Sequence, residues 1–228
     1  MLGSMFIFDI MSGGYTGVEV LIILAAFAAT VVIAISSHEF AHAYAALRAG
    51  DHTAKMAGRL TLDPRAHFEP LGLLCFLFVG IGWAKPVPVN PFRYRNFKRG
   101  NFWVSISGVL TNIVIAFVCS FAFFMVDRFG NLDNTLIFGL YWFFMLMLLI
   151  NVTLAVFNLL PIPPLDGYNL LVSFTKPNNN FMRFMRENAM IMLLLVLFIV
   201  PVIFQVSIIF LAREYLVDAF LSFWGLFI

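Results

Sequence analysis

Apolar residues run continuously along several stretches of this chain instead of alternating with polar ones. The first long stretch, 18–35, contains Glu19 as its only charged residue. Two more follow, at 102–126 and at about 135–160, and each is long enough to cross the hydrocarbon core of a bilayer as a helix. Continuous runs favour helices over a membrane β-barrel, whose strands alternate. We therefore expect an all-α polytopic membrane protein.

The stretch between residues 50 and 100 breaks this pattern. The apolar run 70–82 is short for a complete span, so it predicts a short membrane element, a re-entrant element or a buried helix. Residues 56–62 could form one or two short strands. Prolines within Lys85–Pro91 force an extended segment that cannot be helical.

Two further apolar stretches, at about 188–204 and 206–227, follow a polar segment that is net positive. With these included, the pattern predicts five to six transmembrane helices, with short strands and a re-entrant or short membrane element near residues 50–100. The basic residues of 85–99, which are accompanied by no acidic residue, indicate a cytoplasmic face by the positive-inside rule. The polar connection 127–134 is then expected on the outer side.

Composition supports a membrane protein. Of 228 residues, 62% are hydrophobic and 11% are charged, and a soluble domain of this size cannot bury so much apolar surface. The net charge of +2 does not imply nucleic acid as a partner. Cys75 and Cys119 lie inside apolar runs without the spacing of metal ligands, so we interpret them as small buried hydrophobic residues.

Ionisable residues appear abruptly at the end of the first apolar stretch, in His38-Glu39-Phe40-Ala41-His42. The helical pattern continues to a first plausible stop at Gly50-Asp51. Histidines four positions apart lie on one face of a helix and can bind the same metal ion. Glu39 would then lie beside the ion and polarise a water molecule. Ionisable groups inside a membrane-spanning helix are costly and usually functional. Their presence here favours a metal site over structural histidines.

A catalytic zinc ion needs three protein ligands and one open position. His52 and His67 lie in polar segments outside the membrane core. Asp166 follows a proline-broken helix, where the chain can unwind and a carboxylate can point inward. Pro-Leu-Asp-Gly alone could equally be an ordinary turn. Together with a buried His-Glu-x-x-His motif, Asp166 is the preferred third ligand.

These residues resemble the site-2 proteases, a family of intramembrane zinc metalloproteases. His38–His42 and Asn158–Gly167 match two motifs of the family. Ser107–Asn112 is similar to a third motif, although Val109 replaces its usual proline. Ala84–Pro91 looks like the corresponding segment of the small bacterial and archaeal members. The three motifs are spread over residues 38–167.

The resemblance implies one Zn²⁺ ion per chain. Three residues would hold it: His38, His42 and Asp166. Glu39 would be the catalytic general base and acid. Asn112 and Asn158 would lie near the substrate backbone or the developing oxyanion.

The resemblance also implies the function. Family members cleave membrane-spanning helices of other proteins, so we expect hydrolysis of peptide bonds within or near transmembrane helices, in regulated intramembrane proteolysis. Residues 1–228 would form one integral membrane metalloprotease domain, with the catalytic core at about 18–170 and C-terminal helices at about 187–228. The expected location is a prokaryotic cell membrane, with the active site towards the cytoplasm. The partners would be transmembrane protein substrates and the lipid bilayer, and a homo-oligomer or a regulatory membrane partner stays open.

The main alternative is a metal-binding membrane protein without protease activity, such as a zinc transporter or a silent chaperone. A transporter is expected to carry polar residues on several helices or on related halves. Here they concentrate at two places, and Glu39 is present although metal binding alone does not require it. A purely structural helix bundle would leave the buried His-Glu-His group unexplained.

Overall fold

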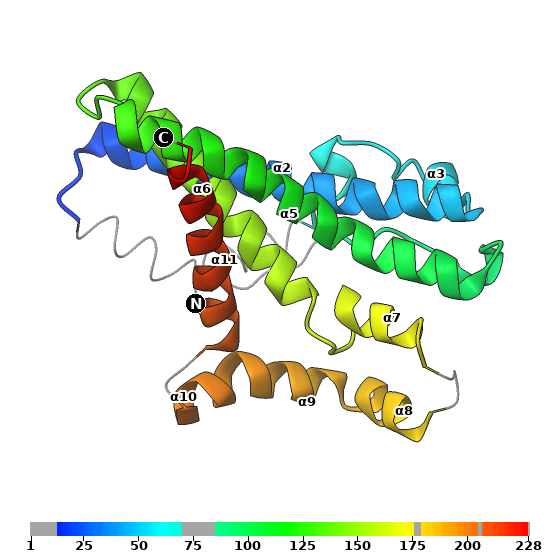
Figure 1. Ribbon diagram of the computed structural model, residues 1–228. Helices are drawn as coiled ribbons and strands as arrows, with labels where there is room; N and C mark the ends of the chain where they lie inside the picture. The colour runs from blue at the N-terminus through cyan, green and yellow to red at the C-terminus, as the bar shows by residue number, and fades with distance from the viewer. Residues whose placement is uncertain (1–12, 70–84, 176–178, 205–206, 228) are drawn as a thin grey trace.

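The computed structural model describes residues 13–69, 85–175, 179–204 and 207–227 of the chain, and this part is mostly helical and contains no sheet (Figure 1). The α-helices are α2 (Gly17–Ala49), α3 (Thr53–Met56), α5 (Phe97–Phe129), α6 (Thr135–Asn158), α7 (Asp166–Val172), α8 (Asn180–Glu187), α9 (Ala189–Leu194), α10 (Val200–Phe204) and α11 (Ile208–Gly225). The shorter elements are the 3-10 helices η1 (Pro64–Ala66) and η2 (Pro91–Arg93) and the π-helix η3 (Leu195–Ile199).

Three of these helices, α2, α5 and α6, are long and apolar enough to cross a membrane. The segments Asn180–Glu187 and Ala189–Ile203 would add a fourth span if they act as one, although they are bent by 74°. The described residues therefore support three to four spans, and the expected five to six are not confirmed. The helix α11 is not counted as a span because it carries three charged residues, Arg213, Glu214 and Asp218, within its 18 residues.

The short strands expected at residues 56–62 are not present in this described segment. The chain leaves α3 through a turn at Gly58, whose φ is 68°. This segment is joined to Lys85 and Pro86 by a buried arginine side chain and not by the backbone hydrogen bonds of paired strands. Arg59 Nη2 donates to the carbonyl oxygens of Lys85 at 2.6 Å and Pro86 at 2.9 Å. The apolar run 70–82, expected to be a short or re-entrant element, lies outside the described residues.

The three long helices form the centre of the molecule, with α6 crossing α2 and α5 (Figure 1). Small side chains at the crossings allow close packing, as is usual between membrane helices. Ala34 of α2 lies in a buried cluster with residues of α6, and Ala116 of α5 lies in another with Val152 of α6 and Val217 of α11. At the polar end of α2, Ala46 lies in a further buried cluster with Val104 of α5, so this end packs against α5.

Local sequence determines where α2 begins and ends. Thr16 and Glu19 form a capping box in which the Thr16 N–H donates to Glu19 Oε2 at 2.7 Å, so the lone acidic residue of the apolar run serves the helix start. At the other end Gly50 has φ 108°, a left-handed conformation that favours glycine. The predicted boundaries of the first helix are therefore confirmed to within one residue.

Asp51 ties the end of α2 to the extended segment that precedes η2. Its fully buried carboxylate accepts hydrogen bonds from the N–H groups of Asn90 at 2.6 Å and Thr53 at 3.0 Å. Burial alone would raise the pKa of this carboxyl, but the hydrogen bonds from Thr53 and Asn90 outweigh it and lower the pKa below its ordinary value. The carboxylate therefore stays ionised at neutral pH and holds Lys85–Asn90 beside α2.

Candidate metal centre

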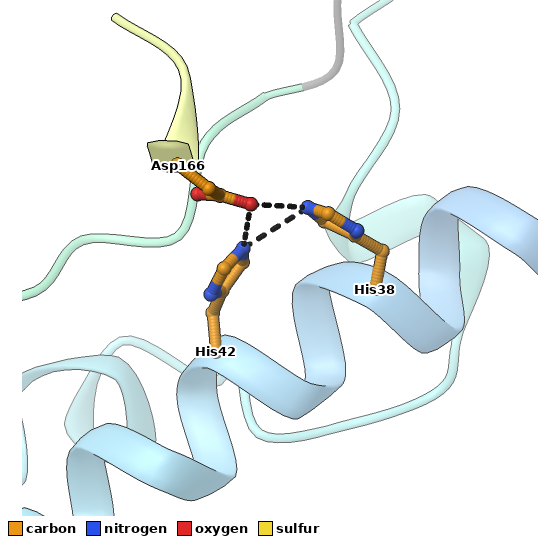
Figure 2. A group of neighbouring side chains, drawn as sticks. All are labelled: His38, His42 and Asp166. Atoms are coloured by element: carbon orange, nitrogen blue, oxygen red, sulfur yellow. Dashed lines mark hydrogen bonds and ion pairs between the residues drawn. The ribbon is translucent and has the colours of Figure 1, made fainter. Parts of the chain in front are cut away.

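His38 and His42 lie one turn apart on α2 and point towards the same place (Figure 2). Their Nε2 atoms are 3.0 Å apart, and each lies 3.2 Å from Oδ2 of Asp166. Asp166 comes from the first turn of α7, far along the chain from the histidines. Within the part of the chain that the structure describes, these three residues are the one group of histidine, cysteine and carboxylate side chains placed to share a metal ion.

A close backbone approach positions Asp166. The next residue, Gly167, lies in the first turn of α7, so near the end of α6 that a β-carbon there would overlap the carbonyl oxygens of Leu159 and Leu160. Glycine is the residue that permits this approach. The Asp-Gly pair therefore directs the carboxylate back towards α2, which an ordinary solvent-exposed turn would not require.

The hydrogen bonding of the site favours a cation. His42 Nδ1 lies 2.7 Å from the carbonyl oxygen of Val104, which can only accept, so His42 carries its proton on Nδ1 and presents the Nε2 lone pair. Asp166 Oδ2 is buried and has no hydrogen-bond partner besides its two histidine contacts. Facing lone pairs repel one another unless a cation lies between them. Two imidazole nitrogens and one carboxylate oxygen fit a catalytic zinc ion.

Glu39 lies beside this group on α2 but is held by a different element. Its Oε2 atom accepts a hydrogen bond from the Val87 N–H at 3.1 Å. Val87 belongs to the extended segment Lys85–Asn90, which Arg59 and Asp51 fix in place. The carboxylate is only partly exposed, and its second oxygen has no partner among the described residues. Glu39 can therefore exchange a proton with a water molecule at the site.

Comparison with known proteins identifies the family. The model of Peptidase family M50 matches residues 125–201. The protein YwhC of Bacillus subtilis is 37% identical over 173 residues, which cover 75% of this chain and 79% of YwhC. Rip2 of Mycobacterium tuberculosis H37Rv is 33% identical over 194 residues, which cover 82% of this chain and 70% of Rip2. The chain belongs to the M50 peptidases.

The names of YwhC and Rip2 assign both provisionally to the zinc metalloproteases. No solved structure matches the chain. As an M50 peptidase, the site-2 protease family, the protein is a membrane metalloprotease, and the expectation of a zinc metalloendopeptidase of this type is confirmed. The alternative of a metal-binding protein without protease activity is therefore set aside.

The other candidate residues of this M50 peptidase lie in different surroundings from one another. Asn112 is fully buried, and its Oδ1 lies 2.6 Å from His38 Nδ1, so its position suits the orientation of His38. Asn158 is partly exposed and donates to the Leu154 carbonyl at 3.0 Å. His52 and His67, the weaker ligand candidates, bond to carbonyl oxygens elsewhere and are not brought to the site.

Sequence reasoning missed Gly108 of α5 as an individual site residue. A β-carbon at this position would lie 2.5–2.7 Å from three atoms of the His38 ring, closer than real β-carbons approach other atoms. The imidazole of this M50 peptidase therefore lies directly against the backbone of α5. The sequence did contain Gly108, in the third motif of the family, but the motif alone did not reveal which residue the glycine contacts.

We expect Gly108→Ala to displace the His38 ring and lower both zinc affinity and peptidase activity. Residues that position a metal ligand typically contribute about 10–100-fold to either quantity, and the change should fall in that range. Zinc affinity can be measured by competition with a coloured chelator in detergent. Gly139→Ala is a suitable control, because its β-carbon would meet only an isoleucine methyl group, at 3.3 Å. Equal zinc affinity in the two variants would contradict the role of Gly108.

Proposed function

We propose that this protein is an intramembrane zinc metalloprotease that hydrolyses peptide bonds within or near the transmembrane helices of membrane-protein substrates, in regulated intramembrane proteolysis. The observation that carries the proposal is the convergence of His38, His42 and Asp166 between long apolar helices. A group of this kind in a membrane-spanning helix is costly unless it serves a function. Membership of the M50 peptidases supports peptide-bond hydrolysis. The location of the site among membrane-spanning helices points to a membrane-protein substrate.

The three side chains would bind one zinc ion per chain. Two imidazole nitrogens and a carboxylate leave one coordination position open, as in catalytic zinc sites. When bound, the ion would act as a Lewis acid that lowers the pKa of water and polarises the scissile carbonyl group. Asp166 would also offset one unit of the positive charge in a low-dielectric environment.

Glu39 would act as the general base and then as the general acid. Its free oxygen would take a proton from the attacking water and return it to the amide nitrogen that leaves. The hydrogen bond from the Val87 N–H holds the other oxygen, which limits rotation of the carboxylate. Glu39 therefore needs no large movement between the two proton transfers.

A helical substrate must unwind before attack, because its carbonyl groups are hydrogen-bonded within the helix. The extended segment Lys85–Asn90 would receive the unwound strand by edge addition. Two of its N–H groups, those of Val87 and Asn90, already donate to Glu39 and Asp51. The N–H of Val89, which is 36% exposed, has no hydrogen-bond partner among the described residues. Asn158, at the end of α6, would contact the substrate backbone or the developing oxyanion.

The proposed orientation places the site towards the cytoplasm. The exposed basic residues around η2 and the start of α5 favour that side under the positive-inside rule. Water would then enter past the end of α2. Residues 1–228 would act as one membrane domain, with a catalytic core at about 18–170 and C-terminal helices at about 187–228.

The test uses the purified full chain in liposomes with a single-span membrane protein as substrate. We expect two fragments whose masses place the cut within or beside the apolar segment, and we expect cleavage to stop when a zinc chelator is added and to resume when zinc is restored. A soluble peptide with the extramembrane sequence of the substrate serves as the control. Cleavage of that peptide alone, with the spanning substrate left intact, would rule out intramembrane proteolysis.

A further inference from the structure

A chain of polar side chains crosses the buried centre of the helix bundle behind His38. Asn112 of α5 and Asn151 of α6 are both fully buried, in a region where the surrounding residues are apolar. Unpaired amide groups are costly in such surroundings. The proposed catalytic cycle gives Asn151 no role, yet the residue is hydrogen-bonded at both ends of its amide.

The hydrogen bonds of this chain have a fixed direction. Asn151 Nδ2 lies 2.8 Å from the carbonyl oxygen of Met147, which can only accept, so the NH₂ group of Asn151 must face it. The Asn151 Oδ1 atom then faces Asn112 and accepts from Asn112 Nδ2 at 2.8 Å. The carbonyl oxygen of Ala34 lies 3.3 Å from the same Asn112 nitrogen. Two acceptors thus orient the amide of Asn112.

With its NH₂ group directed at these acceptors, Asn112 presents Oδ1 to His38 Nδ1 at 2.6 Å. An amide oxygen accepts only, so the partner nitrogen must carry a proton. We propose that Asn151 and Asn112 form a directional hydrogen-bond relay that holds the proton of His38 on Nδ1 and so leaves its Nε2 lone pair for the metal. Both are positioning residues. The inference rests on the proposed ligation by His38.

The need for a relay follows from the location of His38. His42 is oriented by a backbone carbonyl, that of Val104. Around the His38 ring, α5 offers a side-chain amide instead, and an amide can be turned either way. Asn151, which is itself linked to the backbone of α6, and the Ala34 carbonyl together remove this ambiguity. Without these two acceptors, a rotated Asn112 would present its NH₂ group to His38 and favour the proton on Nε2, where it blocks metal binding.

The first measurement is the tautomer of His38 in zinc-free protein. The chain has four histidines, so ¹⁵N-histidine labelling gives few signals, and His52→Gln and His67→Gln assist their assignment. We expect the His38 proton on Nδ1 in the unaltered protein. A proton on Nε2 there would overturn the proposal, whatever the variants do.

The variants test the two residues separately. Asn112→Leu should give a mixed tautomer and weaken zinc binding by about 10–100-fold. Asn151→Leu should have a smaller effect in the same direction, because the Ala34 carbonyl still orients Asn112. Asn112→Asp keeps an acceptor for the imidazole proton and should retain the Nδ1 tautomer and bind zinc more tightly than Asn112→Leu.

Ser120→Ala is the matched control, because Ser120 is also fully buried on α5 and bonds to Trp224 of α11 at 2.8 Å. It should leave the tautomer and zinc affinity unchanged. An unchanged tautomer in Asn112→Leu, or an equal loss of zinc affinity in Ser120→Ala, would overturn the relay. Failure of the ligand assignment would look different: His38→Ala would bind zinc normally while the tautomer of His38 in the unaltered protein stayed on Nδ1.

Discussion

Glu39→Gln is expected to lower the rate of substrate cleavage by about 10²–10⁴-fold, the usual contribution of a general acid–base residue, while zinc remains bound. Glutamine cannot take the proton of the attacking water. Its amide oxygen can still accept from the Val87 N–H, so the local structure should persist. The measurement compares initial cleavage rates in liposomes with the zinc content of the same samples by elemental analysis.

Glu19→Gln is the matched control for this substitution. Glu19 lies on the same helix, but its carboxylate belongs to the capping box with Thr16, where glutamine is also accepted. Its cleavage rate should stay close to that of the unaltered protein. An unreduced rate in Glu39→Gln would show that another group takes the proton, and loss of zinc from that variant would point to a structural role of Glu39 instead.

Asp166→Ala is expected to abolish cleavage because the metal is lost. The substitution removes a proposed ligand and leaves two histidines, so zinc affinity should fall by more than about 100-fold, the upper end for residues that only position a ligand. Zinc content after dialysis against a weak chelator measures this directly. Excess zinc should restore part of the metal content, which distinguishes a weakened site from an unfolded protein.

The control for this loss is Asp133→Asn, which removes an exposed carboxylate from the connection between α5 and α6. It should retain both zinc and activity. If Asp166→Ala kept a full complement of zinc through dialysis, the third ligand would have to be another residue, and Asp166 would lose its place in the proposed site.

The long helices could be predicted from sequence because their signals are local. A continuous apolar run and a glycine stop define α2, and the expected spans at 102–126 and 135–160 correspond to α5 and α6. The structure starts α5 earlier, at Phe97, since Asn96 caps the helix through a bond from the Arg99 N–H at 3.0 Å. Because the first turn of α5 contains basic residues, the pattern of apolar residues alone did not predict this start.

The parts that sequence reasoning missed depend on contacts between distant residues. Asn151 is a single polar residue in an apolar run, and its partner Asn112 lies 39 positions away. The expected place of Asn112, near the substrate backbone or the developing oxyanion, came from the family motif, because nothing local revealed its contact with His38. Gly108 and Gly167 have a recognisable role only when the ring or backbone that each one accommodates is known. Likewise, the segment after α3, which could have formed short strands by its composition, is held by the Arg59 side chain, a contact with a distant residue.

The order of the proposed ligands along the chain has a consequence for biosynthesis. Both histidines are on α2, whereas Asp166 begins α7, after α5 and α6. A nascent chain that has been inserted as far as α6 therefore has an incomplete site. The enzyme should stay inactive at the translocon, surrounded by other newly inserted helices, until α7 has been synthesised and docks against α5. Proteolytic activity would thus appear only once the helix bundle has assembled.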